Sequence, residues 1–292
     1  MRYKSFSDYR PRHVLCFLGP KGGFQRLLRS VQASIEDLAV DFEIDMAFSQ
    51  DASDDRMSES FSVCWDQVHE DAWHQHDVEV MSHGCVVYVV GPLMEVAETL
   101  AVSVAALMLV KRVLEAGATA AKGESAGVAH GAARWRQLAR EAEGSEPCAV
   151  ARACRLAFTK RPITDGDFFS SVGFHLVGLP EVFVPASSSM DELALSAMID
   201  SVADEMAADG VEAVVARHGA KLKPSMTLKK TISSTIHSVA SILPPLCIEL
   251  RRLTATSAQE GRLSKSALGR GCVKTPLRRM VFRHQSWSGG IG

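Results

Sequence analysis

The sequence predicts an α+β fold, with a mixed or largely antiparallel sheet packed by about three main helices, in a single domain with a basic C-terminal extension. Short apolar runs typical of buried strands alternate with longer segments whose apolar residues recur at helical spacing. Hydrophobic residues make up 47% of the 292 residues, which is enough to bury a substantial core. The charge balance also changes sign near residue 220, which separates the predicted domain from its extension.

The last quarter of the chain differs in charge from the rest. From residue 220 onward there are 13 Lys and Arg but only two acids, Glu249 and Glu260, a surplus of +11. Subtraction from the whole-chain totals of 32 basic and 34 acidic residues leaves 19 against 32, or −13, for residues 1–219. We therefore predict an acidic domain over residues 10–223 and a basic, poorly patterned, mobile tail over residues 224–292.

The tail has a second interpretation. Its arginine pairs, together with Phe282 and Trp287, are residue types that contact phosphates and stack on bases. Nucleic-acid binding by the tail is therefore the alternative interpretation, and no other part of the chain predicts it. A disordered extension is the preferred interpretation, because no periodicity follows Leu250.

The first part of the domain predicts a strand, a helix, a strand, a loop and a further strand. Val14–Gly19 is a short apolar run, and the apolar stripe after it predicts a helix over residues 24–40. Phe42–Ser49 and Phe61–Trp65 roughly alternate apolar and polar residues, as strands do. The acidic, serine-rich stretch between them predicts an exposed loop.

The middle of the domain is expected to hold its central helix. Asp71–Ser82 fits either a strand or a helix end, whereas Val86–Val90 predicts a buried strand. Pro92 suits a first helical turn and Gly117 suits the position past a helix end, so we predict a helix over residues 93–116. This helix is apolar almost all round, so it must be covered on most sides and pack on the sheet.

The last third of the domain completes the predicted fold. Residues 118–129 suggest a strand or loop of small residues, 132–143 a charged helix, and 150–158 a strand with one face inward. Ser189-x-x-Glu192 is a capping pattern, and we predict a final helix over residues 190–209.

A hairpin is predicted before that helix. Its arms are residues 173–178 and 181–186, and proline in the intervening Leu179-Pro180 sets the backbone for a turn. His175 and Glu181 then lie on facing arms, where a cross-strand contact is expected.

These elements, taken in order, resemble the bacterial family called domain of unknown function 4261 over about residues 73–223. The residues that carry the resemblance are Trp73, His83, Gly117, His130, Gly173, Gly178, Pro180 and Glu181. The resemblance implies a compact α+β protein with a helix between the tryptophan and His83. It implies no reaction, and the association of the family with toxin and secretion loci implies an immunity or accessory role.

One cluster of residues predicts an alternative function in metal binding. His69, His76, His83 and Cys85 are ligand types for zinc, and a helical spacing would place the three histidines on one face. A single helix does not surround a metal, so the competing interpretation is a set of exposed histidines with a capping or core His83.

A second alternative is a hydrolase that uses Ser125 and His130. Gly123-Glu124-Ser125-Ala126-Gly127 matches the letters of a nucleophile elbow. The residues before it are not a strong apolar strand and no helix follows directly, so a loop of small residues is the competing interpretation.

The remaining features predict a cytoplasmic protein that does not enter a membrane. The apolar run at residues 14–18 is shorter than the roughly 7–15 residues of a signal-peptide core. Leu100–Val110 is about half of the ~20 residues that a membrane span needs. The seven cysteines are odd in number and form no C-x-x-C pair, which suits a reducing compartment.

We therefore predict a non-enzymatic protein-binding module without a cofactor. The immunity or secretion-accessory role is the one that the resemblance implies. The expected partner is a protein with a basic surface, because a charge of −13 over residues 1–219 attracts cations.

Overall fold

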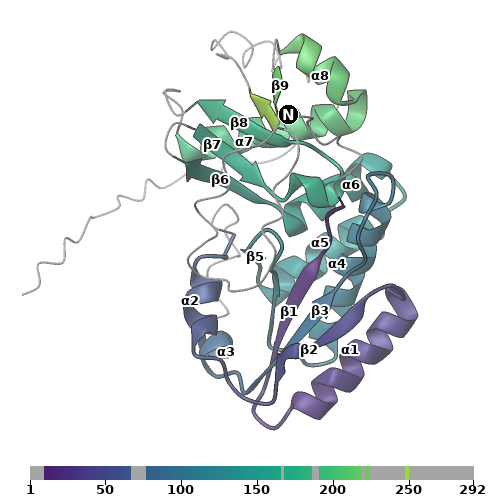
Figure 1. Cartoon of the computed structure of the whole chain (residues 1–292), viewed down its shortest axis with the longest axis vertical. Coiled ribbons are helices and arrows are strands. Elements are labelled where there is room, and N and C mark those ends of the chain that lie inside the picture. The colour runs from purple at the N-terminus through teal and green to yellow at the C-terminus, as the bar shows by residue number, and fades with distance from the viewer. Residues whose placement is uncertain are drawn as a thin grey trace, which may run out of the picture. The chain divides into compact units, whose positions relative to one another are not determined.

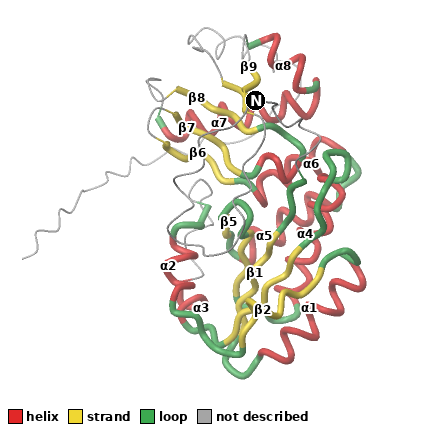
Figure 2. Tube along the Cα trace, in the orientation of Figure 1, coloured by secondary structure: helices red, strands yellow, loops and turns green. Residues whose placement is uncertain are grey.

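The computed structural model describes residues 10–66, 77–165, 168–185, 191–218, 221–223 and 247–249. Within these residues the fold is α+β, as predicted, but its strands form two five-stranded sheets instead of one. Figure 1 labels the elements, and Figure 2 shows helices on both sides of the sheet that contains β1. The described residues all belong to one compact unit, which spans residues 1–252.

The N-terminal sheet is antiparallel throughout. Its strand order is β2-β3-β1-β4-β5, and each adjacent pair runs antiparallel. The bounds are β1 Val14–Gly19, β2 Glu43–Gln50, β3 Cys85–Val90, β4 Ala120–Gly123 and β5 Val128–Ala129. Phe17 lies opposite Val87 on one side and Ala121 on the other, so β1 is the central strand.

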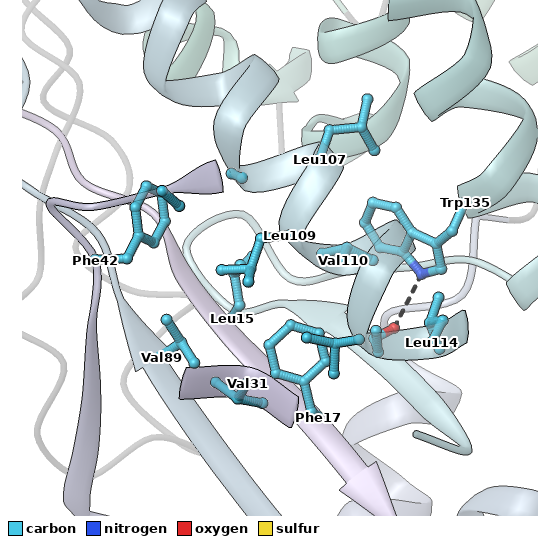
Figure 3. Packing of buried hydrophobic residues seen from close by; sticks show 14 of the residues in the cluster. Leu15, Phe17, Val31, Phe42, Val89, Leu107, Leu109, Val110, Leu114 and Trp135 are labelled. Carbon is cyan, nitrogen blue, oxygen red and sulfur yellow. Dashed lines mark hydrogen bonds between the residues drawn. The ribbon is translucent and has the colours of Figure 1, made fainter. Parts of the chain in front are cut away.

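One face of this sheet carries the main core. Alternation along β1 directs Leu15 and Phe17 into this core, where they are fully buried. Figure 3 shows them packed against residues of α1 and α4 and against Trp135 of α5, whose Nε1 donates to the Ala121 carbonyl at 3.2 Å. The helices that contribute to this core are α1 Phe24–Leu38, α4 Thr99–Glu115, α5 Ala132–Ala142 and α6 Pro147–Phe158.

The predicted central helix is α4, and it begins later than predicted. It starts at Thr99 instead of residue 93, so Pro92 is not in its first turn. The segment before it is held in an irregular course by the chain near β1: Met94 N–H donates to the Pro11 carbonyl and Gly91 N–H to the His13 carbonyl, both at 2.8 Å. Tertiary hydrogen bonds therefore override the local preference of proline for a helix start.

The opposite face of the sheet is covered by two short helices, α2 Arg56–Ser62 and α3 Asp77–Met81. Cys16 and Leu18 of β1 pack there against Met57, Phe61 and Val80. The predicted strand at Phe61–Trp65 is thus wrong, since Phe61 is helical and Trp65 makes a single bridge with Ala129. Phe61 faces the sheet from the last turn of α2, whereas Val63 is exposed, and five residues were too few to separate the two periods.

The C-terminal sheet has the order β6-β7-β8-β10-β9. Its bounds are β6 Lys160–Asp165, β7 Phe168–Val172, β8 Glu181–Pro185, β9 Lys221–Lys223 and β10 Cys247–Glu249. β10 comes from the predicted tail and pairs in parallel with β8, so this sheet is mixed. The predicted boundary at residue 223 stays a prediction, but one strand from beyond it belongs to this sheet.

The structure corrects the predicted strand over residues 150–158, which is part of helix α6. Pro147 occupies the first turn and the Glu146 carboxylate accepts from Cys148 N–H at 3.4 Å, so the helix has a proper start. Its Arg155 is buried and forms ion pairs with Asp200 and Asp204 of α7. Helix α7, Glu192–Asp209, agrees closely with the predicted range 190–209.

The capping residue of α7 and the hairpin before it also differ from prediction. Asp191 accepts from Ala194 N–H and caps the helix, whereas Ser189 lies outside the described residues. β7 and β8 do form an antiparallel pair, but residues 173–178 are not an arm of it. They form a connection that contains the 3₁₀ helix η3, Phe174–Val177. A further short helix, α8 Val211–Arg217, follows α7 and was not predicted.

Candidate functional site

The strongest candidate for a binding surface is the edge of the N-terminal sheet at β2. This strand ends the described order of strands and has β3 as its neighbour. Between residues 30 and 55 the chain has eight Asp and Glu and no Lys or Arg. We call residues 36–55 the acidic edge. Its exposed acids are Glu36, Asp37, Asp41, Glu43, Asp51 and Asp55.

A bulge interrupts β2 in the middle of the acidic edge. Asp45 lies opposite Tyr88 and Gln50 opposite Val86, so residues 46–49 face a single residue of β3. Side chains replace the missing ladder bonds. Ser49 Oγ accepts from Tyr88 N–H at 3.0 Å and donates to the Asp45 carbonyl at 2.7 Å, and Asp45 Oδ1 accepts from Ala47 N–H at 3.0 Å. The bulge is therefore fixed by its own polar residues.

His83 fixes the end of the acidic edge. Asp54 N–H donates to His83 Nε2 at 2.9 Å, and His83 Nδ1 donates to the Val80 carbonyl. Hydrogen bonds from Arg56 lower the pKa of Asp54, so this carboxyl stays ionised. His83 thus joins the acidic edge to helix α3, which is the structural role that the sequence offered as the alternative to a metal ligand.

The metal-binding alternative receives little support from the part of the cluster that is described. Both ring nitrogens of His83 are used in hydrogen bonds, and burial raises the pKa of the Cys85 thiol, whereas a metal requires the thiolate. His69, His76 and Trp73 lie outside the described residues. Within the described ranges, no three or more His, Cys, Asp or Glu are placed to hold a metal ion.

Ser125 and His130 have structural partners. Ser125 Oγ donates to the Arg12 carbonyl and accepts from Val14 N–H, both at 2.8 Å. His130 is buried, and its Nε2 donates to the Ala157 carbonyl at 3.1 Å. A nucleophilic serine must donate its hydroxyl hydrogen to a base, but here that hydrogen is directed at a backbone carbonyl. The geometry therefore gives the hydrolase alternative no support.

A buried charged pair was missed by sequence reasoning. The Lys122 side chain is fully buried, and its Nζ lies 2.8 Å from Glu124 Oε1 and donates to Ser60 Oγ of α2. Burial opposes the charge of Lys122, but Glu124, together with Cys16 and Cys64, more than offsets it and raises the pKa of the lysine. The signal in the sequence was a lysine in a run of small residues, two positions before a glutamate.

Two other groups beside this pair are held in their neutral forms. Burial and the charge of Glu124 raise the pKa of Cys16 to about 12, and burial also raises the pKa of Tyr88. A nucleophile needs a lowered pKa, so Cys16 behaves as a small apolar side chain. The pair at Lys122 thus ties α2 to β4 and offers no reactive group.

The residues that carry the family resemblance near the C-terminal sheet surround a buried carboxylate. Glu181 is fully buried; its Oε1 accepts from Gly173 N–H and His175 Nδ1, both at 2.8 Å, and its Oε2 accepts from Ser171 Oγ. The predicted contact between His175 and Glu181 is present, but it runs from η3 to the first residue of β8 and not across a hairpin. Ser171 was not predicted.

Gly173 is required by its surroundings. Its φ is +102°, and a Cβ atom would lie 2.7 Å from both the Phe158 carbonyl oxygen and Ala126 Cβ. Gly178 and Gly117 also have positive φ, at the ends of η3 and α4, and Gly117 lies past the end of its helix as predicted; Pro180 immediately precedes β8. These family-pattern residues therefore have conformational and structural roles.

His13 belongs to a buried hydrogen-bonded chain next to this carboxylate. Its Nε2 donates to Ser103 Oγ at 2.8 Å, because that hydroxyl in turn donates to the Leu176 carbonyl at 2.8 Å. Burial and the neighbouring His175 lower the pKa of His13 to about 3. The unfolded chain therefore binds a proton at His13 below about pH 6.5, whereas the folded chain does not.

The protein is expected to lose stability on acidification through His13. Above pH 6.5, the ordinary pKa of histidine, neutral His13 does not reduce the free energy of unfolding. As the pH falls from 6.5 toward 3, protonation of the unfolded chain lowers that free energy progressively. At pH 5 the loss is about 2 kcal/mol, measured by urea unfolding against pH 7. His13→Gln keeps a donor for Ser103 and should show a flatter dependence on pH. An identical slope in both proteins would contradict the assignment.

A separate groove of about 770 Å³ lies between α5, α6 and α7. It is lined by Arg134, Glu141, Cys148, Ala149, Arg152, Leu156, Asp204, Ala207 and Ala208. Its lining mixes both signs of charge, and Asp204 is already paired with Arg155. None of the predicted site residues lies in it, so it does not define a ligand.

No helix in the described part of the chain is long and apolar enough to cross a bilayer.

No family model, curated protein or solved structure matches this chain. The acidic edge is therefore the candidate site, and it is identified by the outer position of β2 and by its exposed acids.

Proposed function

We propose that this chain is a non-enzymatic protein-binding module whose acidic edge recognises a partner with a basic surface. The observation that carries the proposal is the position of the acids: a segment with eight carboxylates and no Lys or Arg includes β2, the outermost strand of the N-terminal sheet among the described residues. Such a charge distribution attracts a cationic partner and speeds its association.

The other polar clusters support a role without catalysis. The carboxylate of Glu181 accepts three short hydrogen bonds, Lys122 is neutralised by Glu124, and the Ser125 hydroxyl is bonded to backbone. Groups that are satisfied in this way stabilise a fold. An immunity or secretion-accessory factor is the biological form that we propose, on the resemblance to domain of unknown function 4261.

A cytoplasmic location belongs to the same proposal. The described cysteines, Cys16, Cys64, Cys85, Cys148 and Cys154, are free thiols, which suits a reducing compartment. Masking of a basic toxin or effector in the cytoplasm would use the acidic edge in the manner proposed.

Calorimetric titration against proteins encoded by neighbouring genes tests this function. We expect binding that weakens with salt, and a loss of roughly threefold to tenfold in affinity for Asp41→Asn/Glu43→Gln, because exposed charges contribute little each and act mainly on association. Glu115→Gln/Glu212→Gln, which removes two exposed acids elsewhere, is the matched control. Absence of heat with every basic neighbour would remove the support for the proposal.

A further inference from the structure

Three large apolar side chains are exposed within the acidic edge. Val40 is 78% exposed, Met46 58% and Phe48 50%. Met46 and Phe48 belong to the bulge of β2, and exposed Asp41, Glu43 and Asp51 lie on either side in the sequence. Apolar residues ringed by charged ones are the usual composition of a protein-binding surface.

The bulge holds these side chains in a fixed frame. Asp45 and Ser49 bond the backbone at both ends of residues 46–49, and the Phe48 ring lies edge-on to Tyr88 with centroids 6.2 Å apart. A surface that is ordered before binding loses little conformational entropy when a partner arrives. Met and aromatic residues in such positions are also the types that contribute most at interfaces.

The same bulge decides how a partner binds. Extra residues in an edge strand disrupt its ladder and hinder the addition of a further strand. Recognition at this edge must therefore use side chains.

We infer that Met46 and Phe48 are an apolar anchor for a basic amphipathic segment of the partner, whose apolar face covers them while its Lys and Arg pair with the surrounding acids. This inference rests on the proposed function and adds the chemical class of the partner segment. Charge complementarity selects the occupant: a symmetric contact between the acidic edges of two copies would bring like charges together, whereas a basic segment brings opposite charges.

Two synthetic peptides of equal length and charge test the inference. One alternates lysine with leucine, and the other has serine in place of every leucine. Fluorescence anisotropy with the full chain should show the leucine peptide binding about tenfold more tightly, the usual effect of an apolar hot spot. In Met46→Ser/Phe48→Ser this preference should vanish, with the salt dependence of binding retained.

Leu193→Ser is the control, since Leu193 is 70% exposed on α7 and lies outside the acidic edge. This variant should still bind the leucine peptide more tightly than the serine peptide. Equal binding of both peptides to the unmodified chain, or a preference that survives Met46→Ser/Phe48→Ser, overturns the anchor but leaves the proposed function standing. If neither peptide binds, or if binding is indifferent to salt and to Asp41→Asn/Glu43→Gln, the proposed function fails as well.

Discussion

Replacement of Glu124 by leucine is expected to lower the free energy of unfolding by about 3–5 kcal/mol, because it leaves the ammonium of Lys122 buried without its counter-charge. The Lys122 side chain is fully buried and that of Glu124 is 8% exposed, so water cannot take the place of the carboxylate. The Ser60 hydroxyl is a neutral acceptor and compensates only in part. Urea unfolding followed by circular dichroism measures the loss.

The double variant Lys122→Met/Glu124→Leu separates the charge from its packing. Removal of both charges should restore most of the stability, because a buried ion pair is often matched by apolar residues of similar volume. Glu95→Gln is the control, since it breaks the exposed pair with Arg10 and should cost less than about 1 kcal/mol. If Glu124→Leu and Glu95→Gln cost the same, the pair at Lys122 is not the anchor that its burial indicates.

The elements that were predicted well are those whose local pattern and tertiary environment agree. β1, α1, β3 and α7 each have one period over enough residues, and their bounds differ from prediction by at most about two residues. The segment 150–158 instead fits both periods. Residues 150, 154 and 158 suit a strand with one inward face, but they are also spaced by four, and the cap at Glu146 decided for a helix.

The candidate site was predictable in its charge but not in its position. The acids of residues 36–55 are evident in the sequence, whereas the outer position of β2 in the described sheet depends on β3 lying between β1 and β2. The bulge needs the register between β2 and β3, which the sequence does not specify. The contact of Lys122 with Ser60 joins residues 62 positions apart, so no local pattern indicated it.

Glu181 is where the second large effect is expected. Glu181→Gln should lower the free energy of unfolding by about 3–4 kcal/mol, measured by urea unfolding, because hydrogen bonds to a buried charged group are the strong ones. The carboxylate accepts from Gly173 N–H, His175 Nδ1 and Ser171 Oγ. An amide has only one acceptor oxygen, and its NH₂ would meet at least one of these donors.

Smaller changes at the same site should rank below this loss. Ser171→Ala removes one donor and leaves the carboxylate with its two others, so we expect about 1.5–3 kcal/mol. Glu115→Gln makes the same chemical change on the exposed surface of α4 and should alter stability by less than about 0.5 kcal/mol. Were Glu181→Gln as mild as Glu115→Gln, the buried carboxylate would not be what holds the connection between β7 and β8. The residues of the family pattern would then need another explanation.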